Sequence, residues 1–134
     1  EVVKAFKPEK NIIADFGEDS FNFIHSAMRN VCVNGTGGKA FYGIRNIQFA
    51  GKTGTAEVGI GSKKQNHSLF VGFGPIDKPI EEQIAVAIIV EFENNNHLKY
   101  AGNLGAMIMS AYYYKEDYIN AAKRCGYPVK ESYN

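Results

Sequence analysis

Apolar residues in the first third of the chain recur at helical spacing. They fall on one helical face from Ser20 onward, and the glycine in Asn34-Gly35 is typical of a helix end. We therefore predict a helix that begins at Ser20 and stops near Asn34-Gly35, with its apolar face in the core. That face consists of Phe21, Ile24, Met28 and Val31, with Ala27 and Cys32 beside it. Residues 1–18 alternate weakly and predict an extended lead-in.

Three stretches in the middle of the chain have the apolar pattern of strands. They cover residues 48–58, 68–74 and 83–92. The apolar residues Ile44, Ile47 and Phe49 predict an extended approach to the first strand. The connections are short, which favours antiparallel neighbours. The run from Ile84 to Val90 is continuously apolar and predicts a strand covered on both faces.

Two helices are predicted after a turn at Asn94-Asn95-Asn96. The second runs from about Glu116 to Gly126, just before Pro128. The first covers 99–114, and its expected buried stripe is Leu104, Met107, Ile108 and Ala111. The chain has no repeats and no sign of a second domain. We predict an α+β fold in one segment, 1–134, with an antiparallel sheet of three main strands packed against helices.

Composition and charge narrow the class of protein. Of the 134 residues 45% are hydrophobic and 13% aromatic, which is enough for a packed core. A net charge of +1 gives no electrostatic reason to expect nucleic acid as a partner. No apolar run reaches the roughly 18 residues that span a bilayer. The chain opens on Glu1 instead of Met, so we expect a piece of a longer protein.

The two cysteines, Cys32 and Cys125, permit at most one disulfide, and buried free thiols are the preferred interpretation. Their separation fits no metal-ligand spacing, and His25, His67 and His97 form no cluster with them. We therefore predict no metal site and no cofactor.

The most distinctive chemistry lies in the segment Gly51-Lys52-Thr53-Gly54-Thr55-Ala56-Glu57. Glycine inside a strand often marks a place where a ligand approaches the backbone. A phosphate-binding loop would need a glycine where Asn46 stands and a helix after the lysine, and neither condition is met. A solvated edge strand and the Lys-Thr-Gly element of serine acyltransferases remain as interpretations.

The longer series decides between these two interpretations. The motif is followed by a polar loop, by His67 to Pro75, and by the apolar run from Ile84 to Glu91. From about Phe21 to Tyr114 the chain resembles the C-terminal part of the transpeptidase domain of class B penicillin-binding proteins. The resemblance implies the C-terminal portion of a penicillin-binding, serine β-lactamase-like fold, in which the Lys-Thr-Gly strand lines the cleft.

The resemblance also implies roles for four residues. Lys52 would supply positive charge for a substrate carboxylate and for proton transfer near the leaving group. Thr53 and Thr55 would turn hydroxyls toward that carboxylate, and the Thr55 N–H would be one of two oxyanion donors. Gly54 would leave room for the acyl group. Lys52 and Thr55 are therefore the candidate catalytic residues, and the whole set, Lys52 to Thr55, is the candidate substrate-binding site.

The family's nucleophile, the serine of Ser-x-x-Lys, is missing. No serine in this chain is followed three residues later by lysine. The segment from Thr36 to Lys39 has lysine at the right spacing but lies in a glycine-rich loop, which we interpret as a connection. Ser20-Phe21-Asn22 spells the family's Ser-x-Asn but is interpreted as a helix cap. Glu57 is expected on a solvated rim, and His67 is expected to be a hydrogen-bonded structural residue.

The resemblance implies a peptidoglycan D,D-transpeptidase that cross-links stem peptides through an acyl-serine intermediate and is acylated by β-lactams. Its partners would be stem peptides, β-lactam antibiotics and the rest of the parent domain, outside the bacterial cytoplasmic membrane on an N-terminal anchor. A β-lactam-sensing receptor domain and a non-catalytic degenerate module are the alternatives. We expect the isolated segment to be inactive and only conditionally stable, because the family's sheet needs further strands.

Overall fold

The computed structural model describes residues 16–61, 64–92 and 100–129, and it has the α+β organisation that the sequence predicted. In chain order the elements are α1 (Glu18–Val33), the 3₁₀ turn η1 (Tyr42–Ile44), β1 (Ala50–Val58), β2 (Gln65–Gly74), η3 (Ile80–Glu82), β3 (Ile84–Val90), α2 (Tyr100–Tyr114) and α3 (Tyr118–Arg124). The extended lead-in was predicted over residues 1–18, of which 1–15 lie outside the described residues, as does the predicted turn at Asn94-Asn95-Asn96. Glu18 already belongs to α1. Within the described residues, no helix is both long and apolar enough to cross a membrane.

The three strands form one antiparallel sheet in the order β1-β2-β3. Lys52 is paired with Val71, and Ser68 is paired with Val90. The predicted antiparallel arrangement is confirmed, although β2 begins at Gln65, earlier than expected. Within the described parts of the chain, β1 pairs only with β2, so its outer edge is open.

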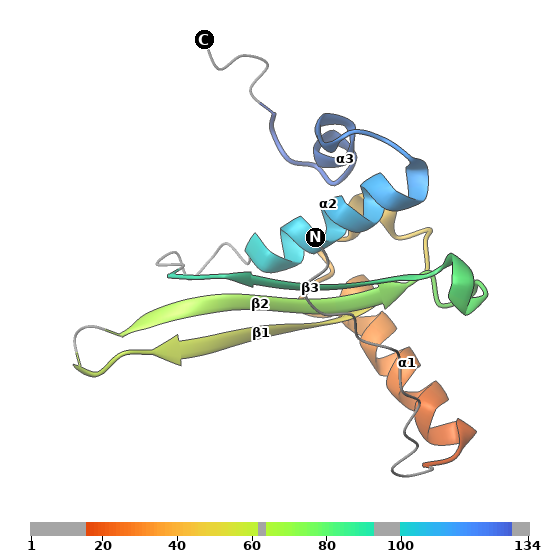
Figure 1. Ribbon diagram of the computed structural model, residues 1–134, viewed down its shortest axis with the longest axis horizontal. Helices are drawn as coiled ribbons and strands as arrows, with labels where there is room; N and C mark the ends of the chain where they lie inside the picture. The colour runs from red at the N-terminus through yellow and green to blue at the C-terminus, as the bar shows by residue number, and fades with distance from the viewer. Residues whose placement is uncertain (1–15, 62–63, 93–99, 130–134) are drawn as a thin grey trace, which may run out of the picture.

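Two helices, α2 and α3, lie on one side of the sheet, and α1 lies on the other (Figure 1). Helix α2 lies along one face and contacts β2 and β3, with α3 beyond it. Helix α1 lies on the other side and contacts β1. Its His25 ring packs edge-on against Phe73 at a centroid distance of 5.2 Å.

The core is built around Phe70, in the middle of β2. Its ring is fully buried and lies 5.5 Å from that of Phe41. Three glycines make room for the ring: a Cβ would stand 2.6 Å from it at Gly51, 2.7 Å at Gly72 and 2.5 Å at Gly105. Burying a phenylalanine side chain contributes about 1.5–3 kcal/mol, and close packing on every side requires these small neighbours.

The predicted buried stripe of α2 was wrong for Leu104 and Ile108, whereas Met107 is partly buried and packs against the core. Leu104 and Ile108 are 42% and 46% exposed. The face turned to the sheet consists instead of Ala101, Gly102, Gly105, Ala106, Met109 and Ser110. Because the Phe70 ring fills the space between helix and sheet, Gly105 must face it, and Met109 packs beside it while Leu104 and Ile108 turn outward.

The predicted burial of the apolar face of α1 was also wrong for its first half. Phe21 and Ile24 are about half exposed, whereas Cys32 is fully buried. Only the C-terminal part of α1 reaches the sheet, and its first turns project beyond it in Figure 1. The helix begins at Glu18 with Gly17 as N-cap, so Ser20 is not the predicted cap.

Two strand predictions need correction. Strand β3 is covered on one face only: alternate residues from Ile84 to Val90 are partly buried, and Ile89 between them is 56% exposed. The approach to β1 is not extended, because Ile44 lies in η1 and a turn follows it. Ile44 and Ile47 are nevertheless core residues.

The C-terminal helices agree with the sequence. Helix α2 spans Tyr100–Tyr114, and α3 begins after Asp117, whose carboxylate accepts a hydrogen bond from the Asn120 N–H at 2.8 Å. Gly126 follows α3 with a φ of 82°, the left-handed conformation that glycine adopts without strain.

Candidate functional site

The segment that leads into β1 is held by an arginine from α1. The Arg29 guanidinium donates to the carbonyl of Arg45 at 2.6 Å and to that of Phe49 at 3.2 Å. Arg45 in turn donates to the carbonyl of Val33 at 3.0 Å. Burial lowers the pKa of Arg29, an effect that the charges of Cys32 and Asp77 partly offset. These contacts fix the start of β1 against α1.

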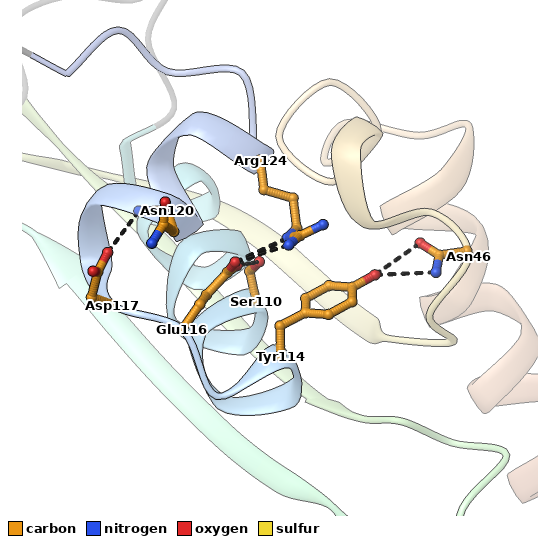
Figure 2. Close-up of polar contacts among 7 residues, drawn as sticks. All are labelled: Asn46, Ser110, Tyr114, Glu116, Asp117, Asn120 and Arg124. Carbon is orange, nitrogen blue, oxygen red and sulfur yellow. Dashed lines mark hydrogen bonds and ion pairs between the residues drawn. The ribbon is translucent and has the colours of Figure 1, made fainter.

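The same segment is held on its other side by α2 and α3 (Figure 2). The amide of Asn46 donates to the Tyr114 hydroxyl at 3.2 Å, and the Arg124 guanidinium stacks over the Tyr114 ring at 3.9 Å. A Cβ at Gly43 would lie 1.8 Å from the carbonyl oxygen of Arg124. Only glycine lets the two backbones approach this closely.

Glu116 organises the corner between α2 and α3. Its carboxylate accepts hydrogen bonds from the Ser110 hydroxyl at 2.6 Å and from Arg124 at 3.0 Å (Figure 2). The hydrogen bond from Arg124, followed by that from Ser110, lowers the pKa of Glu116 against the opposing effect of burial.

The four residues predicted to bind substrate lie on β1 and are divided between its two faces. Lys52 and Gly54 are exposed and pair with Val71 and Leu69, so they share the face away from α2. Thr53 pairs with Phe70 on the α2 side and is 9% exposed. Thr55, two residues further on, is on the Thr53 side but exposed. The Lys52 ammonium and the buried Thr53 hydroxyl therefore lie on opposite faces of the sheet, both on the open edge strand β1.

The ammonium group of Lys52 donates to the carbonyl oxygen of Thr53, on the same strand. The Thr53 hydroxyl is within hydrogen-bond distance of the Thr36 hydroxyl, with 2.5 Å between the oxygens. Both threonines line a cavity of about 470 Å³. The remaining lining residues are Gly37, Lys39, Ala40, Tyr42, Gly102, Asn103, Cys125, Gly126 and Tyr127.

Thr36 is the residue of this arrangement that sequence reasoning missed. The glycine-rich loop was interpreted only as a connection, yet its threonine contacts the central strand across a sequence separation of 17. No local pattern indicates such a contact.

Two flanking predictions are confirmed. Glu57 is exposed and forms an ion pair with Lys64 at 2.6 Å on the surface. His67 accepts a hydrogen bond from the Phe92 N–H at 3.0 Å, and the two rings pack edge-on. His67 is therefore a structural residue.

The described serines occupy structural or surface positions. Ser68 accepts from the Ala101 N–H at 3.4 Å, and Ser110 is fully buried against Glu116. Ser20 and Ser26 lie exposed on α1. None has a lysine three residues later, as the sequence already indicated.

Both cysteines are free and buried, as predicted. Burial raises the pKa of each thiol from 9.0 to about 11, chiefly because a thiolate would be desolvated. In the described ranges, no three His, Cys, Asp or Glu side chains gather in a way that would hold a metal ion.

Comparison with known proteins identifies the class. The sequence model of the penicillin binding protein transpeptidase domain matches residues 2–110, so the chain belongs to this family. A curated relative is the peptidoglycan D,D-transpeptidase MrdA of Acinetobacter baumannii, which is 36% identical over 104 residues. The alignment covers 67% of this chain and 14% of MrdA, so the chain corresponds to a small part of that relative's length. No solved structure matches the chain.

Proposed function

We propose that this chain is the C-terminal part of the transpeptidase domain of a peptidoglycan D,D-transpeptidase, in which β1 binds the substrate. Family membership and the similarity to MrdA support a transpeptidase segment. The observation that carries the proposal for β1 is its open edge, beside which lie an exposed lysine, an exposed glycine and a buried hydroxyl that borders a cavity.

An open strand edge can bind an extended peptide as an additional strand. The Thr53 carbonyl accepts from Lys52, which fits a carbonyl directed away from β2 and toward this edge. Residues two apart on a strand direct their backbone groups to the same side. The Thr55 N–H would then also point to the open edge, where an oxyanion donor is needed.

The four residues would divide the work by their chemistry. Lys52 would leave its carbonyl partner to bind the substrate carboxylate and assist proton transfer at the leaving group. The hydroxyls of Thr53 and Thr55 would bind that carboxylate, since hydrogen bonds to a charged acceptor are the stronger kind. Gly54 would let the acyl group approach the strand.

The nucleophile would come from a part of the parent protein outside this chain. Its serine oxygen would attack the carbonyl of a stem-peptide amide, and the amine of that bond would leave. A second stem-peptide amine would then release the acyl group and form the cross-link. A β-lactam would acylate the same serine with no amine able to leave. The parent would act outside the cytoplasmic membrane on an N-terminal anchor, with residues 1–134 completing its transpeptidase domain.

The test is covalent labelling with a fluorescent penicillin, read by intact mass on the isolated chain and on the parent protein. We expect an adduct on the parent alone. An adduct on the isolated chain would contradict our placement of the nucleophile, and peptide mapping would identify the residue that reacts. Absence of label on both would contradict the proposed function and favour a non-catalytic module. A labelled parent that does not turn over stem peptides would favour a β-lactam-sensing receptor.

A further inference from the structure

The contact between Thr36 and Thr53 joins a loop to the proposed substrate-binding strand through two hydroxyl groups. Their oxygens are 2.5 Å apart, and either can be the donor. Among the residues that the structure describes, neither hydroxyl has another hydrogen-bond partner. Within the described part of the chain, the pair is therefore not part of a larger polar network.

The loop holds Thr36 in place by backbone contacts on both sides of it. The Gly35 N–H donates to the Asn30 carbonyl at 2.9 Å, and the Gly37 N–H donates to the Val31 carbonyl at 3.0 Å. A Cβ at Gly35 would stand 2.8 Å from the Val31 Cα, so the loop lies tightly on the end of α1. These contacts fix the backbone on both sides of Thr36, and the hydrogen bond to Thr53 orients its hydroxyl.

Counting the hydroxyl protons shows which threonine donates to the other when a carboxylate is bound. A hydroxyl carries one proton and can accept at two lone pairs, so only one of the two threonines donates within the pair. If Thr53 donates to a substrate carboxylate, its proton is committed there, and Thr36 must be the donor to Thr53. A chain of hydroxyls that ends on an anion is also mutually polarising, which strengthens each bond in it.

The surroundings of the pair suit an anionic ligand. Both threonines border the cavity of about 470 Å³ to which Lys39 and Asn103 also contribute. The Lys39 ammonium, the Asn103 amide and the Thr53 hydroxyl can each donate a hydrogen bond to a carboxylate.

We infer that Thr36 is a positioning residue, which donates to Thr53 and thereby directs the Thr53 hydroxyl proton toward the substrate carboxylate. This inference rests on the proposed function, since it assigns Thr36 a part in the same site. It adds to the proposed site a residue from outside the Lys52–Thr55 segment.

The experiment compares Thr36→Val with Thr36→Ser in the parent protein. Valine keeps the shape of threonine and removes the hydroxyl, whereas serine keeps the hydroxyl. The second-order rate constant of acylation is measured with benzylpenicillin and with its methyl ester, which lacks the anionic carboxylate. Thermal unfolding of both variants is recorded beside these rates.

We expect Thr36→Val to lower the rate constant for benzylpenicillin roughly tenfold, as loss of a hydrogen bond in a charged chain implies. Thr36→Ser should stay near the unsubstituted protein, and the methyl ester should not distinguish the variants. Equal losses with both compounds, or a serine variant as slow as the valine variant, would overturn the inference, because Thr36 would then act only through the fold. If the unsubstituted parent is not acylated at all, the proposed function is contradicted, and this inference, which rests on it, is contradicted too.

Discussion

At the residue scale, glycines shape both the core and the candidate site. Gly51 and Gly54 are three residues apart on β1, yet they have different surroundings. A Cβ at Gly51 would lie 2.6 Å from the Phe70 ring, and one at Gly54 would lie 3.4 Å from the Leu69 Cβ, an ordinary contact. Gly51 is therefore needed for packing, whereas packing does not account for Gly54.

These two glycines give a matched pair of substitutions. Gly51→Ala should lower the free energy of unfolding by about 1–3 kcal/mol, because its Cβ would overpack the core against the fully buried Phe70 ring. Gly54→Ala should change it by no more than about 0.5 kcal/mol. Chemical denaturation of both variants measures the difference. In the parent protein, Gly54→Ala should slow penicillin acylation while stability is kept; a variant that is acylated normally would count against the proposed role of Gly54.

The buried thiols give a second prediction at this scale. With pKa values raised from 9.0 to about 11, each folded thiol has about a hundredfold less thiolate at pH 8 than an unfolded one. Cys32 and Cys125 should therefore react with a disulfide reagent at least that much more slowly in native than in denatured protein. Because folding disfavours the thiolate, stability should also fall as pH rises from about 9 toward 11. Rapid native-state labelling of either cysteine would contradict their burial.

At the element scale, the corner between α2 and α3 braces the segment that leads into β1. Glu116 joins Ser110 of α2 to Arg124 of α3, and Arg124 stacks on Tyr114, which is bonded to Asn46. Gly43 meets the carbonyl of Arg124 so closely that no side chain fits between them. The position of β1 therefore depends on helices that follow it by more than forty residues, as the separation of 68 between Asn46 and Tyr114 illustrates.

This corner should respond to acid. The pKa of Glu116 is lower in the folded protein than its usual value of 4.5, so the ionised carboxylate stabilises the fold above that pH. The stabilisation should be lost as pH falls below about 4.5 through the lower folded-state value. We expect Glu116→Gln to be less stable than the unsubstituted chain at neutral pH, with a smaller loss of thermal stability between pH 5 and pH 3. Parallel pH profiles for the two proteins would contradict this assignment.

At the scale of the whole molecule, the described elements leave one face of the sheet uncovered where α1 does not reach it. Val71 and Ile89 on this face are 49% and 56% exposed, beside the exposed Ala85 and Ala87. Clustered apolar exposure on a folded monomer usually marks a contact surface. In the proposed parent, the rest of the transpeptidase domain would cover this face.

The uncovered face leads to a prediction about the isolated chain. It should bind a hydrophobic dye such as anilinonaphthalene sulfonate, and the double variant Val71→Thr and Ile89→Thr should bind distinctly less. Both side chains are about half exposed, so the substitutions should cost little stability, about 0.5 kcal/mol or less each. Ser26→Ala, on the exposed surface of α1, serves as a control that should leave dye binding unchanged. Undiminished dye fluorescence in the double variant would place the exposed apolar surface elsewhere.

The sequence by itself determined the kinds of element, their order and the motif. Periodicity is a local property, so the strands, the C-terminal helices and the antiparallel connections could be predicted without tertiary information. Lys52, Thr53, Gly54 and Thr55 are consecutive residues, and their placement on one strand followed directly.

Only the tertiary structure decided which faces are buried and which distant residues meet. Leu104 and Ile108 turn outward because Phe70 requires small neighbours, and Phe21 is exposed because α1 extends past the sheet. The pairing of Thr36 with Thr53 depends on how a loop folds back on the end of α1. Packing is a property of residues brought together from separate segments, and no local pattern of apolar and polar positions records it.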